Sequence, residues 1–151
     1  MRRWRDETGA TAGFEAIPFG VLIFVLGTLL VANAWAVIDA RFAVAAAARE
    51  AARAYVEAPD AGQALVDGQQ AAQATMVAYG RAEPAVRAEV STGGFRRCER
   101  ATWTVTYPVS VIVLPGVFGM REVYDVTASH SEIVDPLRTG LDGEASCIGA
   151  G

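Results

Sequence analysis

The fold is decided by residues 13–58, which read GFEAIPFGVLIFVLGTLLVANAWAVIDARFAVAAAAREAARAYVEA. Ala16 to Ile38 is an apolar run of about 23 residues without a charged side chain, which is long enough to span a bilayer as a helix. An alanine-rich segment follows Asp39 and continues to residue 58 without glycine or proline, so its helix propensity is high. The sequence therefore predicts one continuous helix of roughly 44 residues, with its first half in lipid and its second half outside.

The rest of the chain is expected to be a small head carried on this helix, because 151 residues leave room for one domain besides the membrane segment. A net charge of −4 argues against nucleic acid as a partner, since that would require a basic surface. All 13 basic residues are arginine, which together with the high alanine and glycine content is typical of a GC-rich bacterial genome. We expect a leader at 1–13, a transmembrane helix at 14–38, a protruding stalk helix at 39–58, an extracytoplasmic α+β head at 59–136 and a flexible tail at 137–151.

The charges around the apolar run bear on its orientation. Arg2, Arg3 and Arg5 precede the run and favour an N-terminus in the cytoplasm, although three further arginines follow within about 20 residues of its other end. A cleaved secretory signal peptide is an alternative, because the small-residue pattern VANA ends the run at residues 31–34. The run is, however, longer than the roughly 7–15 apolar residues of a signal peptide.

Several residues in or beside the apolar run bear on how the helix would sit in lipid and pack with other helices. Glu15 stands at its edge, where a carboxylate must stay at the interface or find a partner, and where it would complement the positive end of the helix dipole. Pro18 either lies in the first turn of the helix or kinks it. Small residues that would allow a second helix to approach closely in lipid are Gly20, Gly27, Thr28, Ala32 and Ala36.

The segment after the membrane helix is amphipathic. A stripe at helical spacing must be covered by the head or by a neighbouring stalk, and it consists of Val44, Ala48, Ala51 and Tyr55. Asp60 is a suitable N-cap for a second helix from Ala61 to Tyr79, which Gly80 would terminate. The apolar line expected on that helix is Leu65, Ala72, Met76 and Tyr79.

From Glu83 the pattern changes to alternation, which predicts strands. The expected strands are 86–90, Ala101–Val113 and Arg121–Val134, with a loop from Leu114 to Met120. Pro108 indicates an edge or a bulge, because it cannot donate a hydrogen bond to a neighbouring strand. Three antiparallel strands with helices on one face make an α+β head.

Cys98 and Cys147 are the two cysteines, and an even count in an exported domain favours a disulfide. Closing a loop of about 49 residues would contribute on the order of 4 kcal/mol by the chain-entropy relation. The alternatives are two free thiols, or a reactive Cys98 whose thiol pKa is lowered by the arginines at 96, 97 and 100. The cysteine spacing does not match a zinc site and His130 is the single histidine, so we expect no metal and no cofactor.

The order of these features resembles a known family. The leader sequence DETGATAGFE at 6–15, the long apolar helix and the run AAAREAAR at 46–53 are similar to the start of TadE-like minor pseudopilins, which are type IV pilin-like proteins of the tight-adherence (Tad/Flp) pilus system. The segments TVTYP at 104–108, LPG at 114–116 and VTAS at 126–129 resemble the C-terminal strands of that family. The resemblance covers most of the chain, and its first 55 or so residues are the specific part.

The resemblance implies a processing site and a role for one carboxylate. A prepilin peptidase would cut between Gly9 and Ala10, or alternatively between Gly13 and Phe14, and an uncut chain is a third possibility. Glu15 would be the assembly carboxylate, which neutralises the N-terminal amine of a neighbouring subunit inside lipid. Implied partners are the cytoplasmic membrane, the major pilin and other minor pseudopilins, the prepilin peptidase and the inner-membrane assembly platform.

Two functions from different classes follow. The first is a structural subunit that primes, tips or anchors a pilus, and the second is an uncut, single-pass membrane-anchored binding module that displays the loop Leu114–Met120. An enzyme is disfavoured, because Ser129 and Ser131 would point away from His130 on a strand and no phosphate-binding loop is present in the sequence. We therefore expect no catalytic residue and no small-molecule substrate.

Overall fold

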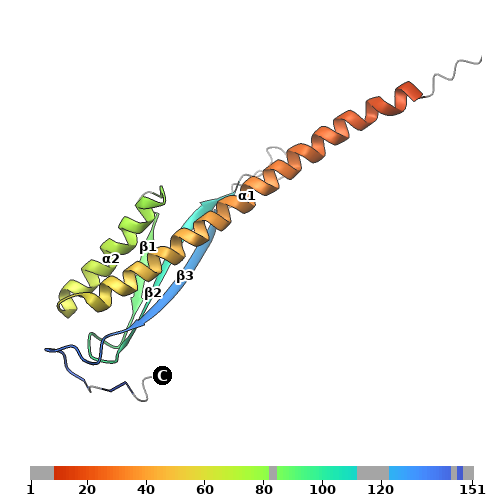
Figure 1. The fold of residues 1–151 in the computed structure, drawn as a ribbon. Coiled ribbons are helices and arrows are strands. Elements are labelled where there is room, and N and C mark those ends of the chain that lie inside the picture. The colour runs from red at the N-terminus through yellow and green to blue at the C-terminus, as the bar shows by residue number, and fades with distance from the viewer. Residues whose placement is uncertain (1–8, 82–84, 112–122, 144–145, 148–151) are drawn as a thin grey trace, which may run out of the picture.

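The computed structural model describes residues 9–81, 85–111, 123–143 and 146–147, with side chains from residue 16 onward. Its first and longest element is helix α1, Gly9–Glu57, with 49 residues and therefore a length of about 74 Å. Figure 1 shows α1 as a rod whose C-terminal half lies beside the other elements and whose N-terminal half extends beyond them. The prediction of one long helix is confirmed, and α1 continues through Pro18 and Gly20.

Helix α2, Ala61–Ala78, begins and ends as its sequence predicts. The Asp60 carboxylate accepts hydrogen bonds from the backbone N–H groups of Gly62 (2.9 Å) and Gln63 (3.0 Å), which otherwise would have no partner at the start of a helix. At the other end Gly80 has a positive φ of 71°. The backbone N–H of Arg81 donates to the Met76 carbonyl at 3.0 Å and that of Gly80 to the Val77 carbonyl at 2.8 Å, which is the Schellman ending that glycine favours.

The prediction for the buried face of α2 is partly wrong. Ala72 and Met76 are buried as expected, but Leu65 and Tyr79 are 47% and 46% exposed. The buried line runs instead through Ala64, Gly68, Ala72 and Met76, which are four residues apart. This line is mostly of small residues, which let α2 lie close to α1 and, at Gly68, to the Trp103 ring of β2.

The strands are β1 (Arg87–Ser91), β2 (Arg100–Ser110) and β3 (Val123–Ile133), and they form an antiparallel sheet in the order β1-β2-β3. The α+β prediction is confirmed. Pairing of β1 with β2 ends at Arg87 opposite Thr106, so Pro108 lies where β2 has β3 as its neighbour, with Asp125 as the partner residue. The proline therefore occupies a local edge, as predicted, and the one-to-one register with β3 shows no bulge there.

The core of the head forms between the C-terminal half of α1, α2 and one face of the sheet. The whole predicted stripe of α1, from Val44 to Tyr55, is buried, so the segment expected to protrude as a stalk is the central helix of the head. The stripe is covered by the chain's own head and not by a neighbour, which settles the alternative left open by the sequence. Fully buried side chains include Ala40, Ala43, Val44, Ala47, Ala48, Ala51, Ala52, Ala64, Ala72, Met76, Ala101, Trp103, Val105 and Val134.

Trp103 of β2 is the largest fully buried side chain in the described part of the head. Its ring lies against Gly68 of α2, so closely that a Cβ at position 68 would overlap it. Tyr55 of α1 packs edge-on against Trp103, with ring centroids 6.1 Å apart, and against Phe95 at 5.4 Å. One aromatic cluster thus joins both helices to the sheet.

Candidate membrane and assembly surface

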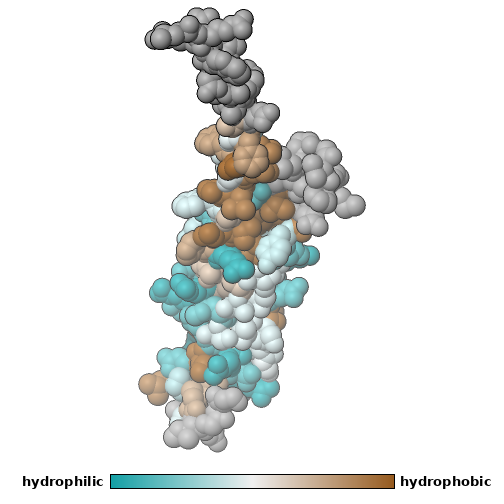
Figure 2. Space-filling view, turned by 90° about the vertical axis from the view of Figure 1, so that its right-hand side faces the viewer, coloured by the Kyte–Doolittle hydropathy of each residue, from teal (hydrophilic) through white to brown (hydrophobic). Residues whose placement is uncertain are grey.

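The N-terminal half of α1 presents large apolar side chains to the outside. Phe24, Leu30 and Trp35 are 73%, 70% and 71% exposed, and the space-filling view shows this apolar surface above the polar head (Figure 2). A water-soluble monomer rarely leaves so large an apolar surface uncovered. Starting at Ala16, the helix is long and apolar enough to cross a membrane, and that stretch is not buried within the chain. Lipid or neighbouring apolar helices would match this surface.

The predicted small residues lie on this surface with one exception. A Cβ built on Gly20 or Gly27 would meet no atom within 4 Å, so the fold of the single chain does not require glycine at either position. Ala36 is different, because it is half-buried against the core of its own head. A shallow apolar hollow surrounds Gly27 and is lined by Ile23, Phe24, Gly27, Thr28, Val31, Ala32 and Trp35.

Thr28 is polar and lies in this hollow, yet its hydroxyl already has a partner. Its Oγ1 donates to the Phe24 carbonyl, one turn earlier, at 2.8 Å. A hydroxyl satisfied in this way can face lipid or a second helix without the cost of an unpaired polar group. The hollow therefore has no unpaired side-chain hydroxyl at Thr28 that would oppose contact with lipid or with an apolar helix.

The predicted processing residues have helical backbone, because α1 already begins at Gly9. Gly9, Ala10, Gly13 and Phe14 all lie in this first part of the helix. The side chain of Glu15 lies outside the described residues, so its role as the assembly carboxylate stays a prediction. The same holds for the loop Leu114–Met120.

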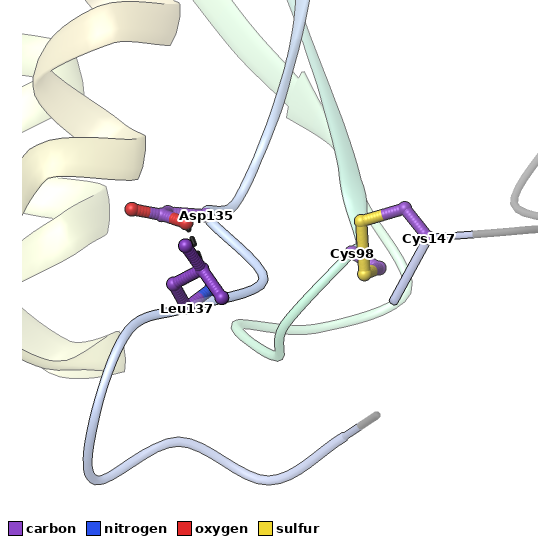
Figure 3. Close-up of a disulfide and its surroundings, with 4 residues drawn as sticks. All are labelled: Cys98, Asp135, Leu137 and Cys147. Carbon is purple, nitrogen blue, oxygen red and sulfur yellow. Dashed lines mark hydrogen bonds between the residues drawn. A yellow bond between two sulfur atoms is a disulfide. The ribbon is translucent and has the colours of Figure 1, made fainter. Parts of the chain in front are cut away.

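The predicted disulfide is present. Cys98 and Cys147 are bonded with their Cα atoms 5.1 Å apart, and the bond joins the turn before β2 to the C-terminal tail (Figure 3). Because Cys98 is bonded to Cys147, the two alternatives, a pair of free thiols and a reactive thiol at Cys98, are wrong. Disulfides persist in oxidising compartments, so the bond indicates a head outside the cytoplasm.

The tail makes contacts that sequence reasoning missed. Its Arg138 donates from Nη1 to the Val56 carbonyl at 2.6 Å and from Nη2 to the carbonyls of Glu57 and Ala58, and it lies over the Phe95 ring at 5.4 Å. A cation there satisfies the last carbonyls of α1 and complements the negative end of its dipole. The residues are about 80 apart in sequence, so no local pattern could have indicated this contact.

A second missed contact marks the boundary between the apolar surface and the head. Asp39 is the first charged residue after the apolar run, and its Oδ2 accepts from Nη2 of Arg81 at 2.6 Å. The Arg81 side chain is only 13% exposed and lies over the Tyr107 ring at 5.0 Å. This ion pair joins the end of α2 to α1 directly after the apolar run.

His130 is the single histidine and the residue weighed above as a catalytic base. Its Nε2 lies 3.6 Å from Oε1 of Glu132, on the helix-facing side of β3. Ser131 is on the other face, where its Oγ is 2.8 Å from Oγ1 of Thr102. Ser131 and His130 therefore lie on opposite faces of the sheet, and the described residues contain no group of three or more His, Cys, Asp or Glu side chains able to hold a metal.

In comparisons with known proteins, no family model matches this chain, and neither a curated protein nor a solved structure matches it. The class of protein therefore rests on the architecture. A long apolar N-terminal helix whose second half packs on a small antiparallel sheet, with a disulfide in the head, is a type IV pilin-like architecture.

Proposed function

We propose that the chain is a minor pilin-like structural subunit of a Tad/Flp-type pilus or of its membrane assembly platform. The observation that carries this proposal is the uncovered apolar half of α1, which is continuous with the central helix of a disulfide-bonded head. A rigid continuous helix lets a subunit be held in lipid by one half while the other half carries a folded domain. This is a structural and not a catalytic role.

The geometry of α1 supports packing against other subunits through the side away from the head. Val31 lines the apolar hollow, and Ala40 is fully buried under the head. They are nine residues apart, and at about 100° per residue this places them on opposite sides of the helix. A neighbouring helix seated against Gly27 would therefore meet the back of α1 without colliding with the subunit's own sheet.

Glu15 would supply the polar contact of such an assembly. A carboxylate at the start of the apolar run is costly in lipid unless a cation pairs with it. The amine created when a prepilin peptidase removes the leader of a neighbouring subunit is a cation of the right kind. In this proposal the major pilin, other minor pseudopilins and the inner-membrane assembly platform are the partners, and the head stays outside the cytoplasmic membrane.

The decisive experiment is the intact mass of the chain extracted from its native membrane, together with its recovery in sheared filaments. A mass lacking the first 9 to 13 residues would support processing by a prepilin peptidase. Glu15→Gln should leave the protein in the membrane but remove it from filaments. Glu50→Gln, an exposed carboxylate on the head half of α1, is the matched control and should behave like the unchanged chain.

Two other results of the intact-mass measurement would contradict the proposal. A full-length chain that never appears with filaments would favour the alternative, a permanently anchored binding module of the cell envelope. A chain that starts between residues 33 and 37 would show a secreted protein whose apolar run is removed.

A further inference from the structure

The head begins to pack on α1 before the apolar run of α1 ends. Ala36 and Val37 are half-buried against the core cluster, and Ala40 is fully buried. The apolar run continues to Ile38, which is 47% exposed. The last turn of the apolar run therefore also packs against the core of the head.

The part of the head at this level is the end of the sheet formed by β2 and β3. Tyr124 pairs with Val109, and Val123 pairs with Ser110. Val123 and Tyr124 are 61% and 50% exposed, and they line an apolar hollow with Val37 and Val111. Figure 1 shows this end of the sheet beside the middle of α1, on the side of the membrane segment.

The rise of an α-helix fixes the height of this end relative to a bilayer. Residues 16–35 cover about 30 Å, which is the thickness of the hydrocarbon core. Val37 then lies about 3 Å beyond that core, and so does the hollow that it lines. Trp35 and Tyr124 have an apolar ring with a polar group, and such residues gather where hydrocarbon meets headgroups.

The charged residues near this end of the head lie just beyond the expected hydrocarbon core. Asp39, which pairs with Arg81, lies about 3 Å further along α1 than Val37, and the exposed Arg41 lies about 3 Å further again. Charged groups at this height would meet lipid headgroups and water. Along the helix axis, apolar residues are thus followed by aromatic and then by charged residues. The same order is found in membrane proteins from the hydrocarbon core of a bilayer outward to water.

We propose that the end of the head made by Val37, Val123 and Tyr124, here called the apolar rim, rests in the interface of the outer leaflet of the membrane that α1 spans. The partner is a lipid surface at the level of the headgroups and first acyl carbons. This inference rests on the proposed membrane span and not on the pilus role. A head docked in this way is held close to the bilayer, and its rim is uncovered when the subunit leaves the membrane.

A second protein could also cover the rim, but the structure favours lipid. The rim is continuous with a helix surface that already requires an apolar environment, and α1 connects the two without a hinge. Insertion of α1 to Ile38 would bring the rim to the interface without any rearrangement. A protein partner is therefore an outcome that the test must separate from lipid contact.

The test is depth-dependent quenching of tryptophan by brominated lipids, with the full-length chain in phosphatidylcholine vesicles. The parent carries Trp4→Phe and Trp35→Phe and keeps Trp103, which is fully buried in the core. Val123→Trp reports on the rim. Ile133→Trp is the matched control, because it lies on the same strand and the same face, ten residues and about 34 Å away.

We expect lipid brominated high on the acyl chain to quench Val123→Trp as strongly as it quenches native Trp35 in a Trp4→Phe chain. The emission of Ile133→Trp should be the same with and without bromine. Equal, weak quenching at both positions at every ratio of lipid to protein would overturn the proposal in favour of a free rim. Quenching at position 123 that appears only after the chain is diluted among excess lipid would overturn it in favour of a rim covered by a neighbouring protein.

Phe24→Trp in the same parent distinguishes failure of this inference from failure of the membrane span. It should be quenched by lipid brominated near the middle of the acyl chain, since Phe24 lies well inside the apolar run. Quenching of Phe24→Trp without quenching of Val123→Trp would overturn the rim contact alone. Loss of quenching at both positions would overturn the span as well.

Discussion

Gly68→Ala tests whether the close contact between α2 and the sheet holds the head together. Gly68 is buried on α2, and Trp103 of β2 is fully buried against it. A Cβ at position 68 would lie 2.7 Å from Cη2 and 2.9 Å from Cε2 of the indole, and still closer to Cζ2. Atoms of a rigid ring in a packed core cannot move aside as the end of a flexible side chain can.

Two effects of opposite sign decide the magnitude. Alanine is a better helix former than glycine by about 1 kcal/mol in a helix interior, which favours the variant. Overpacking a core costs typically about 1–3 kcal/mol, and three contacts below the van der Waals distance place this site in the upper part of that range. We expect a net loss of about 1–2 kcal/mol of unfolding free energy, and a fall in melting temperature of roughly 4–8 °C for each kcal/mol.

The assay is thermal unfolding of the full-length chain in detergent, followed by near-ultraviolet circular dichroism, which reports on the packing of Trp103. Gly62→Ala is the control in the same helix. A Cβ at position 62 would meet only the Asp60 carboxylate oxygen, at 3.3 Å. Its unfolding free energy should stay within about 1 kcal/mol of that of the unchanged chain, since it gains helix propensity without a core clash.

A double-mutant cycle with Trp103→Phe isolates the contact. Phenylalanine is shorter and withdraws the ring atoms nearest to position 68, and it removes an indole Nε1 that is buried without a partner among the described residues. The combined loss should therefore be smaller than the sum of the two single losses. If Gly68→Ala is as stable as the unchanged chain, or if the two losses simply add, the reasoning about this contact is wrong.

Three further predictions concern the contacts that join α1 to the rest of the head. Arg138→Ala should cost about 1–2 kcal/mol by leaving the last carbonyls of α1 without their charged donor, whereas Arg100→Ala, exposed at the start of β2, should change stability little in the same unfolding assay. Reduction of the Cys98–Cys147 bond should raise the intact mass by about 2 Da and lower the unfolding free energy by up to about 4 kcal/mol. Asp39→Asn should cost about 1 kcal/mol in the same unfolding assay, because it removes the carboxylate that pairs with the mostly buried guanidinium of Arg81.

The parts of the fold that the sequence predicted are those that a local pattern determines. The apolar run and the alanine-rich segment predicted α1, and Asp60 and Gly80 predicted the ends of α2, because capping depends on a few adjacent residues. Alternation predicted β2 and β3, since the side chains of a strand take opposite faces in turn. The disulfide also followed from a count of two cysteines in a head expected outside the cytoplasm.

The parts that were missed depend on contacts between distant residues. Hydrophobicity favoured Leu65 and Tyr79 for the buried face of α2, but Ala64 and Gly68 lie on that face instead, and Gly68 lies directly against the Trp103 ring of β2. The contact of Arg138 with the end of α1 required the tail to return across the head, which no spacing within the tail could indicate. Tertiary packing overrode the local preference in both cases.

The side-chain sizes along α1 also show where the surroundings of the helix change. Its exposed N-terminal half carries large residues such as Phe24 and Leu30, and its buried C-terminal half is lined mainly by alanine. In a water-soluble helix the large apolar residues would be the buried ones. The inversion is explained if bulky side chains face lipid, where they need no specific partner, while small ones let α2 and the sheet approach the backbone closely. Because the change occurs around Asp39, the proposed membrane surface lies at this level of α1, which is also the level of the apolar rim.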